Sequence, residues 1–342
     1  MKAFAAAAAF VFAATAGTAS ALCAEDAPPP WAWAFATPPP PGTPPAVPAP
    51  PAALDNTTQL NLPGSKLSFT RAQIANPFGP ADWFPEDHPT MPNIVAHGRE
   101  SAQPQIWACG YCHYPNGKGR PENASVAGLG SEYIVQQLMD FRSGARKTSD
   151  PRKANTAQMA GFATAMTDEE IREAAKYFSS MPATPWIKVA ESETAPKTRR
   201  PKGMMFLTLA GSEAGSEPLG QRIIETPVSA DETEILRNPR SGFVAYVPPG
   251  SLEKGRALVE NGVTASGGKV TPCTPCHGLD LRGLGPVPGL AGRSPSYIAR
   301  QLYDIQHGNR AGTWSPLMAA VVANLGPDDL LAASAYLASL GP

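Results

Sequence analysis

An internal repeat constrains the fold of this chain more than any other feature. Cys109 recurs as Cys273, an offset of 164 residues, and the same offset relates many other positions. The matched residues include Cys112/Cys276, His113/His277, Tyr133/Tyr297, Gln137/Gln301, Asp140/Asp304, Gly144/Gly308 and Arg146/Arg310. Such self-similarity indicates two copies of one domain. We refer to residues 91–183 as the first repeat and to residues 249–342 as the second repeat.

The offset changes after Arg146. From Met159 onward it is 159 residues, so Met159 falls on Met318 and the first repeat has five additional residues. The same offset places Tyr177 on Tyr336. The match therefore continues to the end of both repeats.

The middle of each repeat predicts a helix. Residues 132–143 carry apolar side chains near helical spacing. In the second repeat, Ser294 suits the N-cap of the equivalent helix and Pro295 suits its first residue. We expect a third, shorter helix before each cysteine pair, around residues 92–99 and 252–260.

A closing helix is predicted at the end of each repeat. Residues 167–180 open with Thr167 and Glu170, a spacing at which the two side chains satisfy each other's backbone amides in a capping box. The matched helix is expected over residues 327–340, where two acidic residues follow its first proline.

The start of the chain resembles a secretory signal, assigned here to residues 1–24. Lys2 supplies a positive charge, residues 3–16 are apolar, and small residues permit cleavage after Ala21 or Ala24. We favour Ala24. The chain is therefore expected to be exported.

Two alternatives concern this leader. A lipid-modified Cys23 is disfavoured because Leu22 is larger than the residue that usually precedes such a cysteine. An uncleaved anchor is the other alternative, although its many alanines make a poor membrane span. Membrane association is expected only through an uncleaved signal or through a partner.

Three segments lie outside the repeats. Residues 25–60 are rich in proline and alanine and predict an extended arm, which also contains Trp31, Trp33 and Phe35. Residues 61–90 are a polar, irregular lead-in. Residues 184–248, called the insert below, match neither repeat. We expect the insert to be an extended linker with little regular sheet.

The charge is nearly balanced, with 28 basic and 29 acidic residues and a formal net charge of −1. A nucleic-acid-binding protein would instead show a basic field. We therefore expect no nucleic-acid partner.

Each repeat contains the motif Cys-x-x-Cys-His, at Cys109/Cys112/His113 and at Cys273/Cys276/His277. This motif is the attachment signature of c-type haem. The spacing lets two thiols bond to the two vinyl groups of one porphyrin edge, and the histidine then supplies one axial nitrogen to the iron. Two matches at equivalent positions of an exported repeat protein predict two covalently bound haems.

Two other uses of these cysteines are weaker. One structural zinc site would need the four cysteines together, but the pairs lie in separate repeats and each histidine would lack a role. Thioredoxin-like dithiols would need a βαβ setting that the pattern does not show.

The second axial ligand of each iron is expected to be methionine, since histidine–methionine ligation suits a carrier with a raised reduction potential. Met159 and Met318 are the methionines that the repeat matches. Met166 corresponds to Leu325, so we expect it in the core, and we expect the same of Met139. Matched core packing of Met159 and Met318 is the alternative.

The remaining histidines are weaker candidates. His307 corresponds to Ser143, whereas His88 and His97 lie outside the matched positions. We expect all three on the surface. A departure from histidine–methionine ligation would involve His307.

These motifs, with the distal methionine and the closing helix bearing Tyr177 or Tyr336, resemble class I cytochromes c. The doubled arrangement is similar to the two-domain, di-haem cytochromes of the bacterial periplasm. The resemblance covers the two repeats and implies an all-α fold of two class I domains in tandem, joined by a long irregular linker and preceded by a Pro-rich arm. It also implies that Pro288 gives its carbonyl to the axial histidine. The matched residue is Ala124, which leaves that contact in the first repeat open.

The resemblance implies electron transfer without catalysis. Six-coordinate iron has no vacant position, so the expected role is to accept electrons from a periplasmic dehydrogenase or other donor. The acceptor would be an oxidase or another cytochrome. A di-haem peroxidase is one alternative, and a subunit permanently docked on a dehydrogenase is the other.

Overall fold

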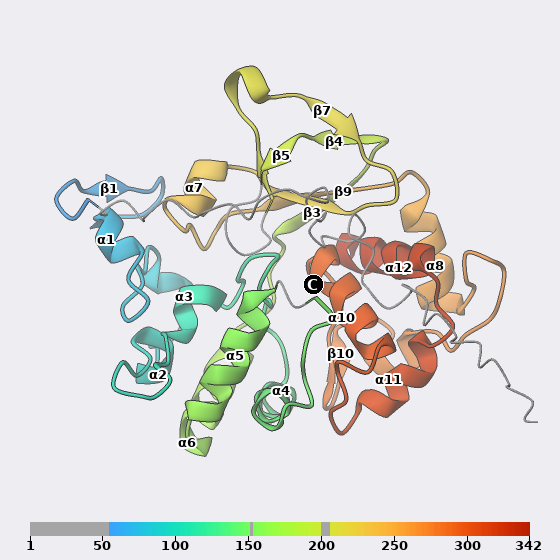
Figure 1. Ribbon diagram of the computed structural model, residues 1–342, viewed down its shortest axis with the longest axis horizontal. Helices are drawn as coiled ribbons and strands as arrows, with labels where there is room; N and C mark the ends of the chain where they lie inside the picture. The colour runs from blue at the N-terminus through green and yellow to red at the C-terminus, as the bar shows by residue number, and fades with distance from the viewer. Residues whose placement is uncertain (1–54, 151–152, 200–205) are drawn as a thin grey trace, which may run out of the picture.

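The computed structural model describes residues 55–150, 153–199 and 206–342 (Figure 1). The expected signal segment, most of the arm and its three aromatic residues lie outside these ranges. Within them, no helix has both the length and the apolar character that crossing a bilayer requires.

The first repeat is helical. Its helices are α2 (Asn93–Ala96), α3 (Cys109–His113), α4 (Ser131–Ser143), α5 (Ala154–Ala165) and α6 (Asp168–Ser179). Helix α4 packs against both α5 and α6. Helix α2 is shorter than predicted because the chain turns at Gly98, which has a φ of +64°, and returns so that Arg99 pairs with Ile106.

The capping box predicted at the start of α6 is confirmed. The Thr167 hydroxyl accepts from the Glu170 amide at 3.2 Å, and the Glu170 carboxylate accepts from the Thr167 amide at 2.7 Å. Ile171, Ala174 and Phe178 then form the buried face of the helix. The local sequence therefore sets both the start and the orientation of this closing helix.

The second repeat has the same outline. Its elements are α8 (Ser251–Asn261), α9 (Thr274–His277), the hairpin β10 (Gly283–Leu284) and β11 (Val287–Pro288), α10 (Pro295–Gln306), α11 (Ser315–Val322) and α12 (Pro327–Ser339). The Ser294 side chain caps α10 as predicted, by accepting from the Tyr297 amide. Helix α12 packs along α8 and α10.

The insert contains more regular structure than the sequence indicated. Its elements are β3 (Ile187–Glu191), β4 (Thr194–Pro196), β5 (Thr198–Arg199), β6 (Leu207–Thr208), the 3₁₀ turn η2 (Gly211–Glu213), β7 (Ser216–Pro218), β8 (Ile224–Pro227), α7 (Ala230–Glu234) and β9 (Phe243–Val247). Strands β3, β9 and β8 form one sheet, in which β3 runs parallel and β8 antiparallel to β9.

The insert sheet packs on the second repeat. Val247 and Ile223 belong to the same buried cluster as residues of α8, α10 and α12, and β3 lies against α12. In Figure 1 the sheet lies above the two repeats, and α4 of the first repeat and α10 of the second lie where the repeats meet. The expectation of a linker with little sheet was therefore wrong, because the strands gain their stability from burial against a helix.

The lead-in also has a small core of its own. It contains β1 (Leu60–Asn61) paired antiparallel with β2 (Ser68–Phe69), α1 (Arg71–Ile74) and the 3₁₀ turn η1 (Pro85–Asp87). Trp83 and Phe84 are buried with Leu62 and Ile74, and Leu236 of the insert packs against them. The lead-in and the insert therefore form one continuous body.

The two repeats meet through equivalent residues. Arg146 and Arg310, which the repeat matches, form an antiparallel bridge. On its two sides, the Lys147 amide donates to Asn309 O at 2.6 Å and the Ala311 amide donates to Ala145 O at 2.7 Å. Arg146 and Arg310 occupy equivalent positions in the two repeats and pair with each other. The contact between the repeats therefore has the form of a two-fold interface.

Candidate functional site

The first Cys-x-x-Cys-His motif forms the single-turn helix α3. Cys109, Cys112 and His113 all line one cavity, which encloses about 1310 Å³ including its open mouth. Much of the wall is apolar, with side chains from α4, α5 and α6 that include Ile134, Leu138, Phe141, Phe162 and Phe178. A large apolar cavity with a few polar groups at one side suits a bound organic cofactor.

The imidazole of His113 is fixed in one orientation. Its Nδ1 lies 2.8 Å from the carbonyl oxygen of Ala124, which accepts only, so Nδ1 carries the proton. Burial lowers the pKa of His113, although the Ala124 carbonyl opposes this. A neutral ring with Nδ1 donating leaves Nε2 free to bind a metal.

Two methionines line the same cavity. Met159 projects from α5, and Met166 lies at the C-terminal end of that helix. Met166 is buried, as expected of a core residue. The cavity therefore places Met159 in the same enclosure as the motif, and the match to Met318 distinguishes it from Met166.

The second motif repeats this geometry. His277 Nδ1 lies 2.8 Å from the carbonyl of Pro288, as predicted, and burial lowers the pKa of His277 in the same way. The Ala124 carbonyl holds the equivalent position in the first repeat, so proline is not required for this hydrogen bond. Met318, on α11, packs with Cys273 against the core of the second repeat.

No disulfide links the four cysteines in the described part of the chain. Burial raises the pKa of Cys109 to about 12 and that of Cys273 to about 11. Among the described residues there is no cluster of three or more His, Cys, Asp or Glu side chains that could hold a metal ion. The described part therefore contains no assembled zinc site.

The second repeat contributes to the wall of the first cavity. Tyr297, Gln301 and Asp304 of α10 line it, together with Arg146 and Lys153 of the first repeat. Burial lowers the pKa of Lys153 to about 7, and the nearby Arg300 guanidinium acts in the same direction. The polar side of the cavity is therefore the side that faces the other repeat.

Sequence reasoning found these polar residues but gave them no role. Arg146 donates to Tyr297 at 3.0 Å and to Gln301 at 2.9 Å. In the reverse direction, Arg310 donates to Gln137 at 2.6 Å. These polar residues are identical in the two repeats. Packing within one repeat does not require such identity, so it was the sequence feature that could have indicated a contact between the repeats.

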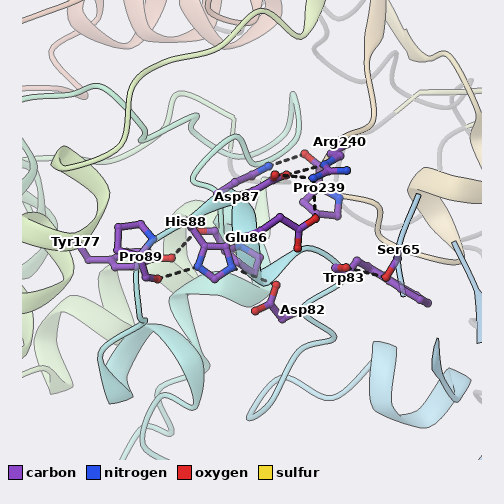
Figure 2. Close-up of polar contacts among 12 residues, drawn as sticks. Ser65, Asp82, Trp83, Glu86, Asp87, His88, Pro89, Tyr177, Pro239 and Arg240 are labelled. Carbon is purple, nitrogen blue, oxygen red and sulfur yellow. Dashed lines mark hydrogen bonds and ion pairs between the residues drawn. The ribbon is translucent and has the colours of Figure 1, made fainter. Parts of the chain in front are cut away.

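The predicted surface position of His88 and the predicted core position of Met139 are both wrong. The His88 side chain is 4% exposed and lies 3.1 Å from Asp82, so it is not a surface group (Figure 2). Burial lowers the pKa of His88, but the hydrogen bonds that its ring gives to Asp82 and to the Pro89 carbonyl, together with the nearby carboxylate charges, outweigh burial and raise it. Met139 is 38% exposed and therefore not in the core. His307 is exposed as expected, and its ring stacks on Tyr303.

The site and the fold together define a class. Two similar helical units, each with a Cys-x-x-Cys-His turn and a histidine held by a backbone carbonyl, have the chemistry of c-type haem attachment.

Comparisons with known proteins agree with this class. The family model described as Cytochrome c matches residues 97–182. Cytochrome c-554(548) of Halomonas halodenitrificans is 34% identical over 21% of this chain and 87% of its own length. Cytochrome c4 of Stutzerimonas stutzeri is 24% identical over 72% of this chain and 90% of its own. The thiosulfate dehydrogenase electron acceptor of the same species is 26% identical over 70% and 82%.

The chain belongs to the cytochrome c family. It is a two-domain, di-haem class I cytochrome c with two covalently bound haem c groups, and its role is that of an electron carrier.

Proposed function

We propose that each repeat attaches one haem and holds its iron between histidine and methionine. The thioethers form at Cys109 and Cys112 and at Cys273 and Cys276, and the axial pairs are His113 with Met159 and His277 with Met318. The haems supply the one-electron chemistry when bound. The chain itself fixes each imidazole through a backbone carbonyl, excludes water with an apolar wall and leaves no open coordination position.

The observation that carries this proposal is the shared enclosure of Met159 with Cys109, Cys112 and His113. A thioether sulfur raises the reduction potential of haem iron relative to a second imidazole. The largely apolar wall acts in the same direction, because it disfavours the additional charge of the oxidised state.

Removing Met159 tests the ligand assignment. The oxidised protein should show the far-red methionine–iron charge-transfer band at an intensity for two haems. Met159→Ala should remove about half of that intensity, and Met318→Ala should remove the other half. Absorbance of the oxidised full-length protein, normalised to haem content, measures both changes.

Met166 provides the matched control, because it lines the same cavity. Met166→Leu, which places in the first repeat the residue that the second has at Leu325, should keep the full band. A band lost in Met166→Leu and kept in Met159→Ala would reverse the assignment.

We also propose that the protein acts in the periplasm and that its donor is a dehydrogenase. Support comes from the expected signal segment at residues 1–24 and from relatives named as thiosulfate dehydrogenase electron acceptors. An oxidase or another cytochrome would then accept the electrons.

Fractionation and a periplasmic extract test this. The haem-containing protein should appear in the periplasmic fraction, and thiosulfate added to the extract should reduce its haems. Retention in the cytoplasm would contradict the location. Reduction by another donor but not by thiosulfate would exclude this dehydrogenase class.

A further inference from the structure

A loop of the insert lies directly on the first haem-attachment helix. This loop, Ile235–Arg240, is called the cap loop below. The guanidinium of Arg237 lies 4.0 Å from the centre of the Tyr111 ring and also donates to the Tyr111 carbonyl. Asn116, just beyond the motif, donates to the carbonyl of Pro239 at 2.8 Å. Tyr111 lies between the two cysteines of the motif, directly before Cys112. These contacts therefore cover the outer side of the motif.

The lead-in holds the cap loop in this position. The indole nitrogen of Trp83 donates to the carbonyl of Leu236 at 2.7 Å. Arg240 forms ion pairs with Asp87 at 2.6 Å and with Glu86 at 3.1 Å. Figure 2 shows this group, with Arg240 and Pro239 of the insert beside Glu86 and Asp87.

The backbone of the cap loop is held in an unfavourable conformation. Arg237 has a φ of +52°, in the left-handed region that residues other than glycine rarely adopt. Such a conformation persists only where surrounding contacts determine it. Here those contacts are the stacking on Tyr111 and the anchoring by Trp83.

The second attachment helix has no such cover in the described part of the chain. Pro275 and Cys276 are exposed, whereas the matched Tyr111 and Cys112 are partly buried. Beyond the second motif, Leu279 is 93% exposed and Leu284, on β10, is also exposed.

Charge around the second motif is low and balanced. Asp280 and Arg282 are the exposed charged residues between Leu279 and Leu284. Their opposite charges offset each other, so this face suits a redox protein that presents an apolar, weakly charged surface.

We propose that the cap loop closes the first haem-attachment site to protein partners, so that redox proteins exchange electrons through the second repeat. This rests on the proposed attachment of a haem at Cys112, because the loop contacts Tyr111 and Asn116, the residues on the two sides of the Cys112–His113 attachment point. The rate of electron transfer falls steeply with distance, so a layer of protein over one edge directs partners to the other.

The experiment uses the full-length protein with both haems, reduced by ascorbate and mixed with oxidised azurin as a protein-sized oxidant. The pair Leu279→Glu and Leu284→Glu places charge on the second face and should slow azurin reduction at least tenfold. Adding Arg237→Gly and Arg240→Ala opens the cap loop, since glycine accepts the φ of Arg237. The rate should then recover at least fivefold.

A matched control and a second readout keep the result decisive. Arg222→Ala removes another insert guanidinium that donates to backbone carbonyls, away from the motif, and should give no recovery. Hydrogen exchange over residues 108–113 should rise in the Arg237→Gly/Arg240→Ala protein alone.

Three results would overturn the proposal. They are an azurin rate that Leu279→Glu/Leu284→Glu leaves unchanged, exchange over residues 108–113 that the arginine substitutions leave unchanged, and increased exchange with no recovery of the rate. A wrong haem-ligand assignment would show instead in the absorbance spectrum, which these surface variants should not alter.

Discussion

Gly255→Ala is expected to lower the free energy of unfolding by about 2 kcal/mol or more, although alanine normally stabilises a helix interior by about 0.5–1 kcal/mol relative to glycine. Gly255 lies on α8 where it packs against α12. An added Cβ would lie 2.1 Å from the Ala332 carbonyl oxygen and 2.5 Å from the Cβ of Tyr336. Both neighbours are at or next to backbone, so the two helices would have to separate.

Gly161 provides the control for Gly255. It lies inside α5, and the nearest atom to an added Cβ is the Cγ of Pro104 at 3.7 Å, an ordinary contact. Gly161→Ala should therefore leave stability unchanged or raise it by up to about 1 kcal/mol. Chemical denaturation of the two haem-containing variants measures the difference. Equal effects at both positions would show that helix propensity, and not the α8–α12 contact, determines the outcome.

The helices of this protein could be predicted because their signals are local. The capping box at Thr167 and the helix start at Ser294–Pro295 each depend on no more than four consecutive residues, and the structure confirms both. The repeat added what single segments lack, since it selected Met159 among several methionines as the residue proposed to bind the iron. The match of Arg146 to Arg310 also marked residues of the interface between the repeats. Identity between two positions does not, however, show which surface those residues belong to.

The insert could not be predicted in the same way because its order is non-local. Strand β9 pairs with β3, which precedes it by more than fifty residues, and neither strand has a short turn to fix the register. The burial of His88 arises from the same cause. Asp82 is only six residues from His88, but Tyr177 comes from a distant segment that only the folded chain brings close. Arg237 likewise gains its position on Tyr111 from long-range packing.

A buried charge cluster links all three parts of the molecule. Arg300, on α10 of the second repeat, is 1% exposed and donates to the carbonyl of Pro121 in the first repeat. Glu225, on β8 of the insert, is also buried and accepts from Ser294 at 2.7 Å. Opposite charges on Arg300 and Glu225 attract each other, while burial lowers the pKa of Arg300 and raises that of Glu225 to about 6.

Arg300→Met is expected to lower the free energy of unfolding by about 3–5 kcal/mol. Methionine roughly preserves the volume but removes the charge that attracts the buried Glu225 carboxylate. Removing one of two opposite buried charges is strongly destabilising because it leaves the other uncompensated. Adding Glu225→Gln removes that charge and should restore at least about 1 kcal/mol. Arg256→Met, at an exposed position of α8, should change stability by less than about 0.5 kcal/mol.

The pH dependence of Arg300→Met separates charge from packing. The pKa of Glu225 is raised in the folded protein from an ordinary value of 4.5 to about 6. Its contribution to stability is therefore fully present below pH 4.5 and is lost as pH rises through 6, by about 2 kcal/mol.

Without Arg300 the folded-state pKa of Glu225 rises further, so the loss of stability is larger. The difference in stability between wild type and Arg300→Met should consequently be greater at pH 7 than at pH 4.5, and the Glu225→Gln background should abolish most of that increase. A difference independent of pH in both backgrounds would mean that Arg300 holds the three parts together by packing and by its bond to Pro121 alone.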